Sequence, residues 1–155
     1  MPSRAIAVGA LALAVGAAIL VLVLDDGSGA RSDAQVIREW SDTLRRGDVA
    51  GAARLFAIPS EVANGTPPVR LATEAQARSF NESLPCGARL LGTRREKGYT
   101  VARFRLTERP GGDCGAGVGD TASTAFRVRD GRIVEWLRVP EDGSSEPPVP
   151  GSATS

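Results

Sequence analysis

Twenty consecutive residues near the N-terminus, Ala5 to Leu24, carry no charged side chain. At about 1.5 Å per residue, a helix of this length crosses a hydrocarbon layer of about 30 Å. A cleaved signal peptide usually has a shorter apolar region of about 7 to 15 residues, so the length favours an uncleaved membrane anchor over residues 1–24. Cleavage near Ala30, after the small residues Ser28 and Gly29, is the alternative and predicts a secreted protein.

The flanking charges predict the side of the membrane on which the remaining chain lies. Arg4 precedes the apolar run and Asp25 and Asp26 follow it, so the positive-inside rule places the rest of the chain outside the cytoplasm. The two cysteines, Cys86 and Cys114, fit that oxidising compartment and predict a disulfide. Two separate buried thiols are the alternative.

Composition excludes several classes of function. With 19 basic and 18 acidic residues, the net charge is +1, so no nucleic-acid partner is expected. Histidine is absent, which removes the commonest general base and the usual imidazole metal ligand. We therefore expect neither a metal site nor a cofactor.

The rest of the chain divides into a short linker, one domain and a tail. Residues 25–31 are polar and glycine-rich, as a tether should be. Residues 32–140 are the length of one ordinary domain. Residues 141–155 have no apolar period and are rich in Pro, Gly and Ser, which predicts a disordered tail.

Three helices are predicted in the first half of the domain. Capping-box patterns at Ser32 and Thr73 predict helices over about 33–46 and 74–84. Between them, Asp48 can cap a helix whose apolar stripe ends at Phe56, before Pro59. The segment that follows, residues 58–72, reads as an irregular loop with one short extended piece at 69–71.

The second half of the domain has the period of strands. Turn pairs at Lys97-Gly98 and Asp130-Gly131 predict two hairpins. The predicted fold class is α+β, with three helices on a curved antiparallel sheet of about four strands, preceded by one transmembrane helix. The strands are expected at residues 88–96, 99–108, 121–129 and 132–139.

Two stretches of this pattern, "GDVAGAARLFA" in the second helix and "FRVRDGRIVEW" in the last hairpin, resemble the nuclear transport factor 2-like superfamily, also called SnoaL-like or ketosteroid-isomerase-like. The resemblance covers about Asp33 to Val139. It implies a cone, in which a bent sheet wraps the helices and leaves an apolar pocket at the open end. Members include isomerases, cyclases and hydrolases as well as non-catalytic binding domains, so the fold does not decide the function.

Glu135 is the acid flanked by apolar residues, and the register of its hairpin decides where it faces. A two-residue turn pairs Phe126 with Glu135 and turns the carboxylate toward the apolar face, where desolvation would favour a general base. A three-residue turn puts Trp136 on that face instead and leaves Glu135 beside Arg127 as an ion pair. We prefer the two-residue turn because it separates apolar from arginine residues better. Tyr99, the single tyrosine, is the other weak catalytic candidate.

Large aromatic residues are the candidates for lining or filling the cone. The ones expected at a ligand pocket are Trp40, Phe56, Phe80, Phe104 and Trp136. Arginines such as Arg103 and Arg105 are expected on a solvated outer face of the sheet, paired with Glu96 and Glu108.

The preferred hypothesis is a non-catalytic, membrane-anchored extracytoplasmic domain that binds a small apolar ligand or an envelope protein. The alternatives are an isomerase or cyclase with Glu135 as general base, and a structural homodimerisation module.

Overall fold

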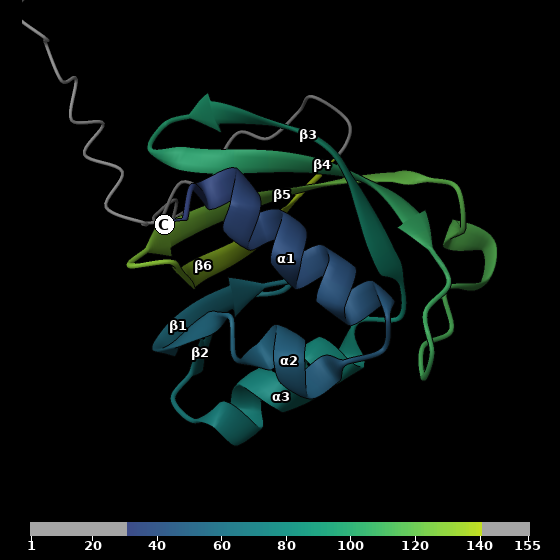
Figure 1. Ribbon diagram of the computed structural model, residues 1–155, viewed down its shortest axis with the longest axis horizontal. Helices are drawn as coiled ribbons and strands as arrows, with labels where there is room; N and C mark the ends of the chain where they lie inside the picture. The colour runs from purple at the N-terminus through teal and green to yellow at the C-terminus, as the bar shows by residue number, and fades with distance from the viewer. Residues whose placement is uncertain (1–30, 141–155) are drawn as a thin grey trace, which may run out of the picture.

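The computed structural model describes residues 31–140 (Figure 1). The predicted anchor over 5–24, most of the linker and the predicted tail over 141–155 lie outside the described residues. Within residues 31–140, no helix is long and apolar enough to cross a membrane.

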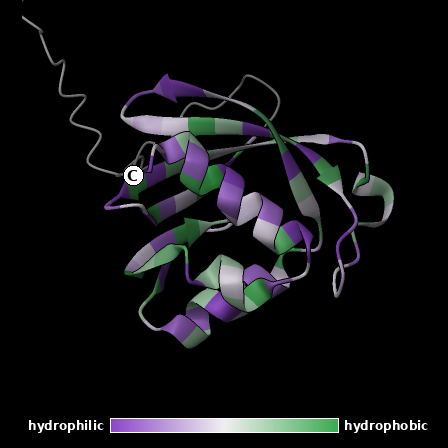
Figure 2. Cartoon of the chain, viewed as in Figure 1, coloured by the Kyte–Doolittle hydropathy of each residue, from purple (hydrophilic) through white to green (hydrophobic). Residues whose placement is uncertain are grey.

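The three helices begin where the capping residues predict. Ser32 caps α1 (Asp33–Arg45), Asp48 caps α2 (Val49–Ala53) and Thr73 caps α3 (Glu74–Ser83). In α1 and α3 both hydrogen bonds of the capping box form, which satisfies backbone N–H groups that otherwise have no partner. The hydropathy colouring of Figure 2 shows hydrophobic and hydrophilic residues alternating along α1, as expected for a helix that buries one side.

The sheet corrects the predicted fold class. Six strands form one mixed sheet in the order β2-β1-β6-β5-β4-β3, so the prediction of about four antiparallel strands is wrong. β1 and β6 run parallel to each other, and the other neighbours are antiparallel. The strands are β1 (Phe56–Ala63), β2 (Val69–Leu71), β3 (Gly87–Glu96), β4 (Tyr99–Thr107), β5 (Thr121–Arg129) and β6 (Arg132–Val139).

The strand that sequence reasoning missed is β1. Phe56 completes an apolar stripe at helical spacing, but α2 ends at Ala53 and Phe56 is the first residue of β1. Pro59 lies inside this strand, where prolines are rare unless the ladder is irregular. The β1–β6 register indeed shifts between Phe56 and Glu61. This shift in the ladder accommodates Pro59, the residue that led us to predict a loop here.

The last hairpin combines features of both predicted registers. Asp130 and Gly131 have φ of 51° and 69°, as a two-residue type I′ turn requires, and Val128 pairs with Ile133. Beyond this pair the register shifts, and Phe126 pairs with Trp136 instead of Glu135. Val134 is the extra residue of this bulge. The turn is therefore the preferred one, but the bulge points Trp136, not Glu135, toward the helices.

The core lies between the sheet and α1, which crosses it in Figure 1. Val36, Ile37, Trp40 and Leu44 on α1 are at most 3% exposed and contact the inner face of the sheet. On β4 every second residue faces inward, since Thr100, Ala102 and Phe104 are buried and Leu106 is partly buried.

The loop after β4 is fastened to the end of α3 in two ways. The predicted disulfide between Cys86 and Cys114 is confirmed. Beside it, the guanidinium of Arg109 is buried and donates hydrogen bonds of 2.7–3.0 Å to the carbonyl oxygens of Glu82, Leu84 and Pro110. A cation at this place also complements the partial negative charge of a helix C-terminus.

Candidate functional site

Glu135 and Tyr99 meet on the outer face of the sheet, opposite α1. The Tyr99 hydroxyl donates a hydrogen bond of 2.6 Å to Glu135 Oε2, and Arg127 Nη1 lies 2.8 Å from Glu135 Oε1. The Arg127 guanidinium also lies over the Tyr99 ring, 4.5 Å from its centroid. Both carboxylate oxygens thus contact side chains of this cluster.

The charge of Glu135 changes how Tyr99 ionises. The hydrogen bond to Glu135 raises the pKa of Tyr99 above its ordinary value, because loss of the phenolic proton would break the bond and set two negative charges side by side. Partial burial raises this pKa further, whereas the charge of Arg127 lowers it. A tyrosine with a raised pKa stays protonated at neutral pH and acts as a hydrogen-bond donor.

The five aromatic residues expected at a pocket contact one another instead of lining one common cavity. Trp40 is in edge-to-face contact with four other rings at centroid distances of 5.5–6.5 Å, an arrangement that aromatic quadrupoles favour. Trp40 Nε1 donates 2.8 Å to Asn81 Oδ1, and both residues are buried. The four rings that contact Trp40 are those of Phe56, Phe104, Phe126 and Trp136. Together with Trp40 they fill the space between α1 and the sheet.

A pocket of about 490 Å³ opens at the side of this core, between α3 and the β1–β2 hairpin. Its walls are largely apolar, with Phe80 from α3, Val62 from β1 and Leu71 from β2. Phe80 is the member of the expected aromatic set that reaches it, and its ring lies 5.1 Å from the Trp136 ring. Polar side chains also line the pocket, namely Asn64, Thr66, Arg70, Gln76, Ser79 and Ser83.

Two buried polar atoms belong to residues that pair with residues of the pocket wall, although neither of these two residues lines the pocket itself. Ser60 Oγ and Trp136 Nε1 have no hydrogen-bond partner within the described part of the chain. Ser60 pairs with Leu71 across the β1–β2 ladder, and Trp136 pairs with Val62 across the β1–β6 ladder. Because a buried donor without an acceptor costs about 1–3 kcal/mol, an acceptor that reached either atom would stabilise the site.

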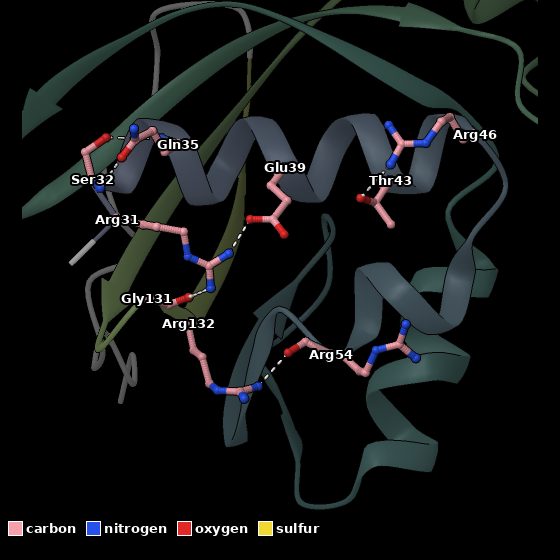
Figure 3. A network of polar contacts seen from close by, with 9 residues as sticks. All are labelled: Arg31, Ser32, Gln35, Glu39, Thr43, Arg46, Arg54, Gly131 and Arg132. Carbon is pink, nitrogen blue, oxygen red and sulfur yellow. Dashed lines mark hydrogen bonds and ion pairs between the residues drawn. The ribbon is translucent and has the colours of Figure 1, made fainter. Parts of the chain in front are cut away.

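A second pocket, of about 740 Å³, lies between α2, α3 and the start of β1. Phe56 forms part of its floor, and Arg54, Arg78 and Arg132 lie around it. Figure 3 shows how Arg132 is positioned, since its Nη1 donates to the Arg54 carbonyl oxygen at 2.6 Å. In the same view Arg31 joins Glu39 on α1 to the Gly131 carbonyl oxygen of the turn.

Sequence reasoning missed two buried polar residues whose hydrogen bonds hold α3 in place. Asn81 lies on the inner side of α3 and bonds both Trp40 and the Ala77 carbonyl oxygen. Arg109 holds the end of the same helix. Asn81 could have been found, because it is a polar residue within the apolar stripe of the third helix. No local sequence pattern predicts that Arg109 is buried. Within residues 31–140, no group of three or more His, Cys, Asp or Glu residues is placed to hold a metal ion.

Comparison with known proteins identifies the fold. A SnoaL-like protein of unknown function from Burkholderia thailandensis aligns with a TM-score of 0.50 and 18% identity, over 70% of this chain and 97% of that one. An NTF2-like protein of unknown function from Cytophaga hutchinsonii aligns with a TM-score of 0.54 and 9% identity, over 70% and 88% of the two chains.

A third structure is a protein with a ketosteroid isomerase-like fold from Catenulispora acidiphila, solved in complex with trimethylamine. It aligns with a TM-score of 0.53 and 11% identity, over 68% of this chain and 85% of that one. No protein-family model matches the sequence, and no curated protein matches it. The predicted resemblance is therefore confirmed at the level of the fold.

Proposed function

We propose that this protein is a non-catalytic, extracytoplasmic binding domain that holds a small apolar ligand between α3 and the β1–β2 hairpin. The observation that carries the proposal is the pocket of about 490 Å³ with Val62, Leu71 and Phe80 in its walls. Pockets of this size, mostly apolar with a few polar groups, are typical of small-molecule sites.

Polar side chains that line the pocket specify the ligand further. Gln76 and Ser79 of α3 line the pocket, and both side chains carry groups that can donate a hydrogen bond. A ligand with an apolar body and one hydrogen-bond acceptor, such as a carbonyl oxygen, would bury its body against Phe80 and meet one of these donors at its polar end. We therefore propose small apolar carbonyl compounds as the ligand class.

The arrangement of Glu135 supports binding over catalysis. Its carboxylate is engaged by Tyr99 and Arg127 on the outer face of the sheet, whereas the pocket lies on the inner side. A general base must come within hydrogen-bond reach of the proton that it removes. The isomerase or cyclase hypothesis therefore has no geometric support at this residue.

Ligand binding is tested by titrating the protein with a series of apolar carbonyl compounds while recording amide chemical shifts. We expect shifts at Val62, Leu71 and Phe80, together with a change in tryptophan fluorescence through Trp136. Val69→Lys places a charge at the pocket rim, at a residue 53% exposed, and should weaken binding by about tenfold, equivalent to ~1.4 kcal/mol.

The matched control is Val118→Lys, because Val118 is 48% exposed and does not line the pocket. It should leave the affinity unchanged. Shifts that spread over the outer sheet face, or equal effects of the two variants, would contradict the proposed site.

Export is part of the same proposal. The apolar segment Ala5 to Leu24 directs the domain to the extracytoplasmic side, and the disulfide supports an oxidising location because such bonds are rare in the cytosol. Fractionation of expressing cells tests this, with the chain expected to be degraded by protease added outside the cell membrane. A protected chain with both cysteines reduced would contradict it.

A further inference from the structure

The pocket of about 740 Å³ between α2, α3 and the start of β1 differs in its lining from the first pocket. Apart from four charged residues, every residue that lines it is alanine, phenylalanine or isoleucine. The first pocket, in contrast, has asparagine, threonine, glutamine and serine in its walls. A lining made of apolar and charged side chains alone suits a ligand that has both an apolar body and a charge.

The two pockets lie on different faces of α3. Gln76, Ser79 and Phe80 line the first pocket, whereas Glu74 and Arg78 line the second. Residues three and four positions apart share one face of a helix, so each set forms its own stripe, and no residue lines both pockets. The second pocket is thus a separate site, and what it binds does not depend on the function proposed for the first.

The apolar part of the second pocket is only partly shielded from water. Ala53 and Phe56 are buried, but Ile58, at the start of β1, is 41% exposed. An apolar ligand lying against Ile58 would remove this surface from water, which is favourable. The volume of the pocket also falls within the range of small-molecule sites.

The charged part of this pocket is mainly positive. Arg54, Arg78 and Arg132 line it, together with a single acid, Glu74. The ion pairs within residues 31–140 involve none of these three arginines. The pocket therefore has a positive charge that no carboxylate of the described structure neutralises.

The arginines also have hydrogen-bond donors to offer. Arg132 Nη1 donates to the Arg54 carbonyl oxygen at 2.6 Å, which holds the Arg132 guanidinium at the C-terminal end of α2 (Figure 3). A guanidinium has five N–H donors, so this bond uses one and leaves the others. The planar fork of a guanidinium matches the two oxygens of a carboxylate.

Glu74 restricts the charge of the ligand. It lies four residues before Arg78 on the same face of α3 and lines the same pocket. A second negative charge on the ligand would be repelled by the Glu74 carboxylate, so the pocket favours a ligand with one negative charge.

We propose that this pocket is a second binding site, which takes carboxylic acids with an apolar body. The body lies against Phe56 and Ile58, and the carboxylate is bound by the arginines of the pocket. The site discriminates by charge, whereas the first pocket binds uncharged carbonyl compounds.

The proposal is tested with hexanoate as the probe and the full-length chain in nanodiscs of uncharged lipid, which accommodate its apolar N-terminal segment. Alanine and isoleucine methyl signals are recorded during the titration, and we expect shifts at Ala53, Ala57 and Ile58. Acetate lacks the apolar body and hexanamide lacks the charge, so each should bind at least about tenfold more weakly than hexanoate at these residues.

A double variant removes the charge that the proposal requires. Arg54→Gln combined with Arg78→Gln keeps two long polar side chains at exposed positions. An exposed ion pair contributes up to about fivefold in affinity, so the loss of two should weaken hexanoate binding by about tenfold. Arg38→Gln combined with Arg138→Gln is the matched control, because both arginines are exposed and line neither pocket. It should leave the affinity unchanged.

Three results would overturn the proposal. Equal losses of affinity in the two double variants would mean that hexanoate responds only to the overall charge of the protein. Hexanamide binding as tightly as hexanoate would show that the arginines do not recognise the carboxylate. Shifts at Val62 and Leu71 in place of Ala53 and Ala57 would put hexanoate in the first pocket, a result that leaves the proposed function standing.

Discussion

Tyr99 and Glu135 are 36 residues apart in sequence, and their side chains are joined by a hydrogen bond of 2.6 Å across the outer face of the sheet. Because Tyr99 is the only tyrosine of the chain, the ultraviolet absorbance of phenolate reports this contact alone. We predict a pKa for Tyr99 above the ordinary value of about 10. Glu135→Ala should lower it, because the hydrogen bond is the largest cause of the rise.

The same contact predicts how stability depends on alkaline pH. The raised pKa means that the folded protein holds this proton more tightly than the unfolded chain does. Its stabilising contribution is complete below the unfolded value of about 10 and is lost as pH rises through the folded pKa. Denaturation at increasing pH should show this loss in the wild type and not in Tyr99→Phe. An equal loss in both would contradict the assignment.

The buried bond between Trp40 and Asn81 predicts an energetic coupling between α1 and α3. Asn81→Ala leaves the indole N–H without its acceptor, so we expect a loss of about 1–3 kcal/mol in the free energy of unfolding, plus the cost of the cavity. In the background of Trp40→Phe that donor is gone, and the cost of Asn81→Ala should be smaller. Urea denaturation of the four proteins completes the double-mutant cycle. Additive costs would show that the bond contributes nothing.

Loss of the disulfide should lower the free energy of unfolding substantially. Cys86 and Cys114 are separated by 28 residues, and the chain-entropy estimate for a loop of this length is about 3.5 kcal/mol. Replacing both cysteines by serine should lower the free energy of unfolding by roughly that amount. The comparison is made under oxidising conditions, and adding a reductant should bring the wild type to the level of the variant.

The loop beside that disulfide approaches α3 so closely that one glycine has no room for a side chain. A Cβ built on Gly112 would lie 2.3 Å from the Pro85 carbonyl oxygen. Gly112→Ala should therefore displace the loop and cost about 1–3 kcal/mol of stability. Gly92→Ala is the control, because nothing lies within 4 Å of the equivalent position there. Thermal unfolding of both variants distinguishes a local clash from a general intolerance of alanine.

Elements with a local signal were predictable from the sequence. Ser32, Asp48 and Thr73 mark the three helix starts because a capping side chain bonds the backbone within three residues of itself. The two hairpins follow from turn residues with positive φ and from alternation in the flanking strands. Such signals need no knowledge of the rest of the chain.

The features that were missed depend on partners distant in sequence. β1 is a strand because it pairs with β6 on one side and β2 on the other, and its Pro59 argues locally for the opposite. The bulge at Val134 shifts the register after a turn whose type was predicted correctly. The pocket residues Val62, Leu71 and Phe80 belong to three elements, so the pocket exists only once these elements have assembled.

Because Val134 is an unpaired bulge residue, the number of residues in β6 can change by one at this position without changing the direction in which the other side chains of the strand face. Removing Val134 would leave Val128 opposite Ile133, Arg127 opposite Glu135 and Phe126 opposite Trp136, now in an uninterrupted ladder. Removing a residue beyond Glu135 would instead turn the rest of the strand over. The hairpin therefore holds one spare residue, and a change in chain length at that point need not move the tryptophan out of the core.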